Sequence, residues 1–156
     1  MNDEFRHAVE LSRTNRPALA ELEALLAQVD ATIASHLARE SEPAACLGGG
    51  GCCKFDLYGH RLYVTPLEFA LLAGRPAPHP EQAARGRCSW QEGPTCSAHA
   101  SRPLGCRTFF CRVANAQTYR DLHEQAHLQV QAVHQRHCIP YCYGELPAVA
   151  AQVLFP

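Results

Sequence analysis

Residues 87–111 read RCSWQEGPTCSAHASRPLGCRTFFC, and the expected fold is organised around this stretch. It holds four cysteines: Cys88, Cys96, Cys106 and Cys111. The Gly, Pro and Ser residues between them favour loops over helices. A second group lies upstream in CLGGGGCCKF, residues 46–55: Cys46, Cys52 and Cys53. Seven thiols in two irregular patches, bracketed by helical sequence, predict a metal or cluster site.

The composition is that of a globular protein. With 156 residues the chain is long enough to bury a core, and we expect one domain. Hydrophobic residues make up 47% and charged residues 19%, which excludes a disordered composition. A net charge of -1 makes nucleic acid an unexpected partner. No secretory signal or membrane span is visible, so we expect a cytoplasmic protein with no membrane partner.

The number of cysteines argues for ligands rather than disulfides. Nine cysteines in 156 residues are about 6% of the chain, which is below the roughly 8–10% typical of a small disulfide scaffold. In a reducing compartment, clustered cysteines serve more often as ligands or redox groups. An odd total also fits a fully paired disulfide framework poorly. Metal or cluster binding is therefore favoured over thiol–disulfide chemistry and over inert buried thiols.

Apolar periodicity and capping residues predict helices on both sides of the cysteines. Asn15 precedes a proline and begins a helix that ends near Glu40. Thr65 and Glu68 form a capping box for a helix over 66–73. Asn115 caps a long helix with a polar face rich in Gln and His. A short helix over 2–13, and a hairpin of strands 55–58 and 61–64, are also expected.

These elements predict a mainly α fold with small irregular or β elements. The helices pack around a cysteine-rich metal-binding loop region in a single compact domain. Its parts are an N-terminal helical region (1–45), a cysteine-cluster metal-binding region (46–112) and a C-terminal helix and tail (113–156).

Soft thiolate ligands select zinc, iron–sulfur clusters or copper(I) over hard cations. Zinc takes four ligands, and iron–sulfur clusters usually take four cysteines. Seven thiols exceed one such site and fall one short of two. One expectation is two metal sites, the second of which is completed by Cys138, Cys142 or a histidine such as His99. The alternative is a single metal site with the remaining thiols around it.

The neighbouring Cys52 and Cys53 restrict the geometry of any site. Successive side chains of an extended chain point to opposite sides, so adjacent cysteines rarely bind one ion without a special turn. Either the pair bridges two neighbouring sites, or one member is a ligand and the other is structural.

The charges around residues 85–112 complement thiolates. This segment holds one acid, Glu92, and five arginines: Arg85, Arg87, Arg102, Arg107 and Arg112. Positive charge near cysteines lowers thiol pKa values and promotes metal binding. The weaker interpretation is a nucleic-acid patch with Trp90, Phe109 and Phe110 as stacking surfaces. Histidines at 123 and 127 are four apart on a helix and could share a metal, although surface histidines are the simpler interpretation.

The second patch matches a known pattern of cysteines. The separate cysteine of that pattern is Cys88. It is followed by Cys96-Ser97-Ala98-His99 and then by Arg102-Pro103-Leu104-Gly105-Cys106-Arg107-Thr108-Phe109. Together the patches resemble the bacterial YkgJ-like cysteine-cluster family of zinc- or iron-chelating proteins, with its CxxCxxCC domain. The family pattern continues as Cys-Ser-x-Tyr, Arg-Pro-x-x-Cys-Arg and an aromatic residue. The resemblance covers residues 46–111 and implies metal chelation without naming a reaction.

The first patch departs from that pattern. Cys46, Cys52 and Cys53 fit its first, third and fourth cysteines, but Gly49 occupies the second position. His99 also stands where tyrosine is usual. Either Cys111, Cys138 or Cys142 replaces the missing ligand, or this protein binds fewer metal ions than members of that family.

Three functions remain open on these grounds. The first is a metal-binding protein with a cysteine-ligated iron–sulfur cluster or zinc, suited to electron transfer or cluster handling. Its expected ligands are Cys46, Cys52, Cys53, Cys88, Cys96, Cys106 and Cys111. The second is a zinc-stapled module that binds a protein or nucleic acid. The third is a thiol redox enzyme without metal.

Overall fold

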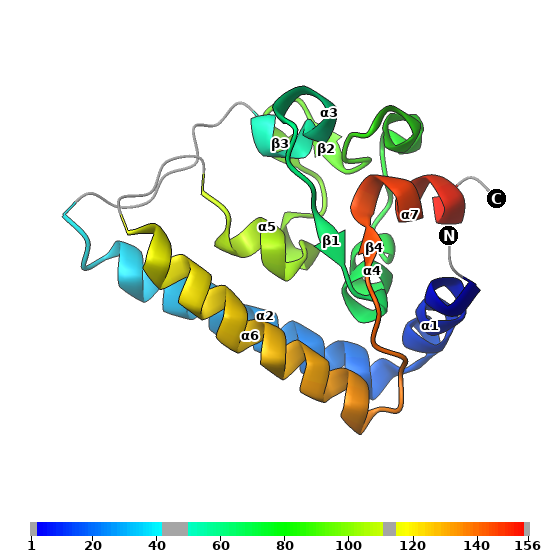
Figure 1. The fold of residues 1–156 in the computed structure, drawn as a ribbon, viewed down its shortest axis with the longest axis horizontal. Helices are drawn as coiled ribbons and strands as arrows, with labels where there is room; N and C mark the ends of the chain where they lie inside the picture. Colours follow the sequence, from blue (N-terminus) through cyan, green and yellow to red (C-terminus); the bar gives the residue numbers. More distant parts are fainter. Residues whose placement is uncertain (1–2, 42–49, 111–114, 155–156) are drawn as a thin grey trace.

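The computed structural model describes residues 3–41, 50–110 and 115–154 (Figure 1). As predicted, the chain is mainly helical. The α-helices are α1 (Asp3–Thr14), α2 (Arg16–Leu37), α3 (Phe55–Tyr58), α4 (Pro66–Ala73), α5 (Leu104–Thr108), α6 (Ala116–Arg136) and α7 (Leu146–Leu154). The strands are β1 (Tyr63–Val64), β2 (Gln91–Glu92), β3 (Thr95–Cys96) and β4 (Gly144–Glu145). Three 3-10 turns complete the described structure: η1 (Gly51–Cys53), η2 (Pro80–Arg85) and η3 (His99–Ser101).

The two longest helices, α2 and α6, lie side by side and run in opposite directions (Figure 1). The predicted caps begin both. The side chain of Asn15 accepts a hydrogen bond from Ala18 N at 3.1 Å, and fixed backbone geometry at Pro17 continues the turn. The side chain of Asn115 accepts from Thr118 N at 3.4 Å. No helix within the described ranges is long and apolar enough to cross a membrane.

The apolar faces of α2 and α6 form one hydrophobic cluster. Its buried members include Leu22, Leu26, Val29, Ile33, Ala126, Val130 and Val133. These residues recur every three or four positions, so each helix turns one stripe inward. Burying that stripe is the main gain that offsets the entropy of ordering the two helices.

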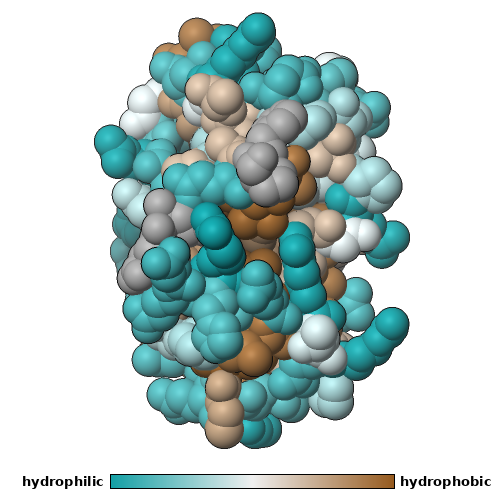
Figure 2. All heavy atoms as spheres, turned by 90° about the vertical axis from the view of Figure 1, so that its right-hand side faces the viewer, coloured by the Kyte–Doolittle hydropathy of each residue, from teal (hydrophilic) through white to brown (hydrophobic). Residues whose placement is uncertain are grey.

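A second hydrophobic cluster joins α1, α4 and α7. Its buried members include Phe5, Phe69, Trp90 and Leu146. The Phe69 ring packs edge-on against both Phe5 and Trp90. Trp90 is fully buried. Its Nε1 donates to Arg75 O at 3.0 Å, so its one polar group keeps a hydrogen-bond partner away from water. Figure 2 shows the outer face on the α1 and α7 side, where hydrophilic side chains surround a central group of hydrophobic ones.

The predicted hairpin over 55–64 is wrong. Residues 55–58 form α3, and Gly59 ends that helix in the left-handed region with φ +68. Gly59 therefore stops a helical turn and does not reverse a pair of strands. Residues 63–64 do form a strand, but they pair with β4 in antiparallel register, Tyr63 opposite Glu145.

The buried carboxylate of Glu68 connects α4 to α5. One oxygen accepts from Thr65 N at 2.9 Å and from Thr65 Oγ1 at 2.8 Å, which confirms the predicted capping box. The other oxygen accepts from Leu104 N at 2.9 Å, at the start of α5. The first turn of α5, which carries Cys106, is thus fixed to the beginning of α4.

Replacing Glu68 with alanine should lower the free energy of unfolding by about 2–4 kcal/mol, because two buried N–H groups lose their acceptor. Urea denaturation followed by circular dichroism measures this change. The matched control is Glu81→Ala, which removes an exposed carboxylate beside His79 and should change stability by less than about 0.5 kcal/mol. Equal effects of the two substitutions would contradict the linking role of Glu68.

Candidate metal centre

Five of the seven predicted ligand cysteines line one cavity of about 1200 Å³. These five are called the thiol cluster: Cys52, Cys53, Cys88, Cys96 and Cys106. They come from four separate segments, namely η1, the chain before β2, the end of β3, and α5. The other two, Cys46 and Cys111, lie outside the described residues. All described cysteines are free thiols.

The short turn η1 brings Cys52 and Cys53 into the same cluster. Gly50 precedes it with φ +63, and a Cβ there would lie 2.2 Å from Gln91 Nε2. Only glycine therefore allows Gln91 Nε2 to reach Gly50 O, to which it donates at 3.0 Å. In this turn the thiols of Cys52 and Cys53 are hydrogen-bonded to each other, so the neighbouring side chains do not diverge as they would on an extended chain.

Backbone hydrogen bonds fix the next two thiols against η1. Cys88 N donates to Cys53 O at 3.0 Å, which holds the two residues next to each other. The β2–β3 hairpin places Cys96 opposite Gln91, the residue that holds Gly50. The same glutamine side chain and the same hairpin thus order both cysteine patches, although more than 30 residues separate them in the sequence.

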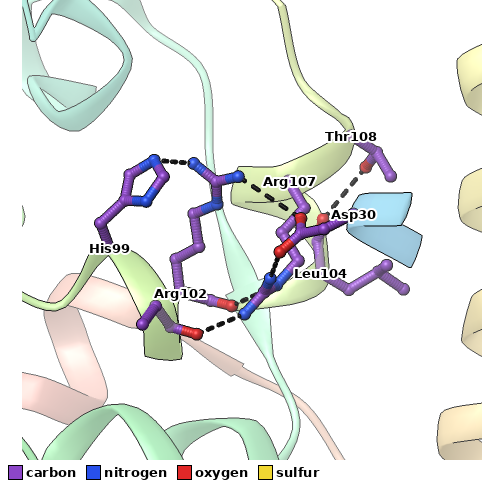
Figure 3. A network of polar contacts seen from close by, with 7 residues as sticks. Asp30, His99, Arg102, Leu104, Arg107 and Thr108 are labelled. Carbon is purple, nitrogen blue, oxygen red and sulfur yellow. Dashed lines mark hydrogen bonds and ion pairs between the residues drawn. The ribbon is translucent and has the colours of Figure 1, made fainter. Parts of the chain in front are cut away.

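The arginines next to Cys106 have different roles (Figure 3). Arg107 is buried and donates to Arg102 O at 2.9 Å, to Ala100 O at 2.8 Å, and to the carboxylate of Asp30 on α2. Arg107 therefore ties the loop before α5 to α2. Arg102 also reaches Asp30, at 3.4 Å, and its Nη1 donates to His99 Nε2.

Arg102 is the arginine whose charge acts on the thiols. Its charge lowers the pKa of Cys52, Cys96 and Cys106, although burial and neighbouring thiols outweigh it in each case. Its Nε is buried and, among the described residues, has no hydrogen-bond partner. Arg87 instead pairs with Asp56 at 3.0 Å.

Burial and neighbouring thiols raise the pKa values of Cys52, Cys53 and Cys106. The pKa of Cys52 is raised first by its hydrogen bond to Cys53 and then by burial. For Cys53, the hydrogen bond to Cys52 lowers the pKa, but the bond to Cys88, burial and the charges of Cys88 and Cys96 raise it to about 12. Burial, then the charges of Cys53 and Cys96, raises the pKa of Cys106. Without a cation, these groups stay protonated at neutral pH.

No group of three or more His, Cys, Asp or Glu side chains in the described parts of the chain is arranged so that it could hold a metal ion. Cys138 and Cys142 do not join the thiol cluster. Cys138 is exposed at the end of α6, and burial raises the pKa of Cys142, which the charge of Glu4 on α1 raises further. His99 lines the cavity and contacts Arg102.

The cavity also exposes Tyr143, which the sequence did not single out. Tyr143 lines it together with His123 and His127 of α6, the pair that the sequence analysis noted for its helical spacing. Tyr141 contacts both His127 and Tyr143. The spacing of two tyrosines at alternate positions was visible in the tail, but nothing local indicated that the tail returns to α6.

The nucleic-acid interpretation loses one of its three stacking side chains. Trp90 is fully buried, so it cannot stack on a base. Phe109 is exposed and stacks on His60, with ring centroids 5.6 Å apart. Phe110 packs against Tyr119 of α6.

Comparison of the chain with known proteins identifies no relative. No family model, no curated protein and no solved structure matches the chain. The YkgJ-like resemblance therefore stays a prediction that depends on residues 46–111, of which the structure describes 50–110.

The raised pKa values of Cys52, Cys53 and Cys106 predict that these three thiols are alkylated slowly in chelator-treated protein. At neutral pH, iodoacetamide should modify exposed Cys138 well before Cys52, Cys53 and Cys106, because the thiolate is the reacting form. Raising the pH to about 9 should accelerate modification of the cluster, since a raised pKa leaves the thiolate fraction small until the solution is alkaline. Peptide mass spectrometry measures each rate. Cluster thiols that react as fast as Cys138 at neutral pH would contradict the described electrostatics.

Proposed function

We propose that this protein binds a thiophilic metal centre, an iron–sulfur cluster or zinc, through the thiol cluster. The observation that carries the proposal is the convergence of five free thiols from four segments on one cavity. Single free cysteines commonly serve as small hydrophobic groups. Five gathered around one space, with hydrogen bonds between the thiols of Cys52, Cys53 and Cys88, are the donor set that soft metals select.

The charges of the site fit a bound cation. Each thiolate that forms makes the next one less favourable, as the raised pKa values of Cys53 and Cys106 indicate. Arg102 supplies one positive charge, which cannot neutralise several thiolates. A metal centre supplies the rest, and its ligands must rotate toward it and release protons on binding, so affinity should rise with pH.

The iron–sulfur cluster is the first candidate for the bound centre. A structural zinc ion and an iron–sulfur cluster each take four thiolates, and five thiols line the cavity. The buried Nε of Arg102 is a donor without a partner in the described structure, and sulfur of a cluster or its thiolates would accept from it. Electron transfer or cluster handling would follow from such a centre.

A zinc-stapled interaction module is the second candidate. It is favoured by exposed aromatic side chains beside the cavity, Tyr63, Phe109 and Tyr143, which are about half exposed. Exposed aromatic groups are frequent at protein interfaces. A redox enzyme with free thiols is disfavoured, because nucleophilic cysteines have lowered pKa values and those of Cys52, Cys53, Cys96 and Cys106 are raised.

Purified anaerobically, the protein should contain tightly bound iron and acid-labile sulfide and should be brown. Cys96→Ser and Cys106→Ser should each lose most of this metal, because serine is a poor ligand for soft ions. Cys138→Ser and Cys142→Ser are the matched controls and should retain it, since neither thiol lines the cavity. Elemental analysis and the visible absorption spectrum measure the outcome, with circular dichroism as the check on folding.

The possible results separate the candidates. A colourless protein that contains stoichiometric zinc, and that loses this zinc in Cys96→Ser and Cys106→Ser, would favour the zinc-stapled module over the iron–sulfur protein. Metal that is absent from the wild-type chain after anaerobic purification and reconstitution would overturn both. Equal metal loss in all four variants would show that the thiol cluster is not the binding site.

A further inference from the structure

The last turn of α6 carries a fully buried histidine, His134, which takes no part in the thiol cluster. It contacts segment 138–143, which leads from the end of α6 to β4 (Figure 1). His134 O accepts from Ile139 N at 3.0 Å, and Cys138 between them adopts the left-handed conformation, with φ +54. Helices usually form this C-terminal turn with glycine, because other residues are strained in that conformation.

One ring nitrogen of His134 has a hydrogen-bond partner and the other has none. His134 Nδ1 lies 3.1 Å from Pro140 O, a carbonyl oxygen that can only accept, so Nδ1 carries a proton and donates it. Nε2 is then left with a lone pair. It is buried, and no hydrogen-bond partner for it exists in the described parts of the chain. The folded structure therefore holds His134 as a neutral imidazole.

No opposite charge compensates a proton on His134 Nε2. Burial lowers the pKa of His134, the backbone groups of Ile139 and Pro140 raise it by less, and no side-chain charge of the described residues is among the causes. The Tyr141 ring packs edge-on against the imidazole, and burial raises the pKa of this phenol, so it stays uncharged. The other ionisable groups on the surrounding elements are Glu4 of α1, Glu21 of α2, Glu68 of α4, His127, Arg136 and His137 of α6, and Cys138, Cys142 and Tyr143 of the segment.

Protonation of His134 therefore requires that its ring reach water, since a charged N–H group without an acceptor is costly in the core. α6 is held against α2 by its apolar stripe. Segment 138–143 is held to His134 by two hydrogen bonds and one ring contact. Regions with few buried contacts open before the whole fold does. Release of the segment also relieves the left-handed conformation of Cys138.

We propose that His134 is an acid-sensitive switch, whose protonation at Nε2 detaches residues 138–143 from α6 and opens the cavity wall at Tyr143. The pKa of an exposed histidine is about 6.5, and that of His134 is lowered in the fold. The neutral imidazole therefore stabilises the closed segment fully above about pH 6.5, and this stability is lost as the pH falls toward the lowered pKa. The switch does not depend on whether the thiol cluster holds a metal.

Hydrogen exchange measured by mass spectrometry on the full chain at pH 7.5 and 5.5 tests this switch. After correction for the intrinsic exchange rates, protection of residues 138–145 should fall by about tenfold at the lower pH, because protonation of an imidazole with a pKa of about 6.5 favours the open segment by that factor. Protection of α2 should stay higher than that of the segment at both pH values. Equal protection of the two regions would show unfolding of the whole chain and would overturn the local opening.

Two variants assign the response to His134. His134→Asn keeps an N–H donor near the position of Nδ1 but takes up no proton, so its protection should not change between the two pH values. His7→Asn is the matched control, because His7 is exposed on α1; it should keep the tenfold fall of the wild type. An unchanged wild type, or an equal fall in His134→Asn, would overturn the proposal.

A titration of the wild-type histidines by nuclear magnetic resonance keeps the test decisive if circular dichroism shows that His134→Asn does not fold. The imidazole of His134 should stay neutral well below pH 6.5 in the closed state, and a pKa of 6.5 or above would overturn the proposal. Iron and sulfide measured in the exchange samples separate opening of the segment from loss of metal by the thiol cluster.

Discussion

The buried carboxylate of Glu68 is the interaction on which the position of the candidate site depends. It caps α4 through Thr65 and holds the first backbone N–H of α5 at Leu104. The cost of burying a charge is offset by three hydrogen bonds to it. α4 is itself anchored in the hydrophobic cluster of Phe5, Phe69 and Trp90. This side chain therefore joins the hydrophobic core to α5, and Cys106 lies two residues beyond Leu104.

The loop that carries Cys106 is also held against the long helix α2. The buried Arg107 donates to the carboxylate of Asp30 on α2 and to the backbone carbonyls of Ala100 and Arg102. Arg102 of the same loop reaches Asp30 as well, and its charge lowers the pKa values of Cys52, Cys96 and Cys106. Helix α2 therefore positions both the loop and the charge that acts on its thiols.

The sequence predicted what depends on near neighbours and failed where distant segments meet. The caps at Asn15, Thr65 and Asn115 are local signals, and each begins the helix that was expected. The hairpin at 55–64 was wrong because the true partner of β1 is β4, far along the chain. The gathering of cysteines was indicated by their spacing. The link from Arg107 to Asp30 spans 77 residues, and no local pattern could have indicated it.

X-ray absorption spectroscopy at the edge of the bound metal tests the central claim most directly, because it identifies the atoms that surround the ion. The account predicts sulfur neighbours at about 2.3 Å for the centre in the thiol cluster. Those sulfur neighbours should be lost in Cys106→Ser and kept in Cys138→Ser. A first shell made only of nitrogen and oxygen in the wild-type protein would contradict the claim that these thiols hold a metal.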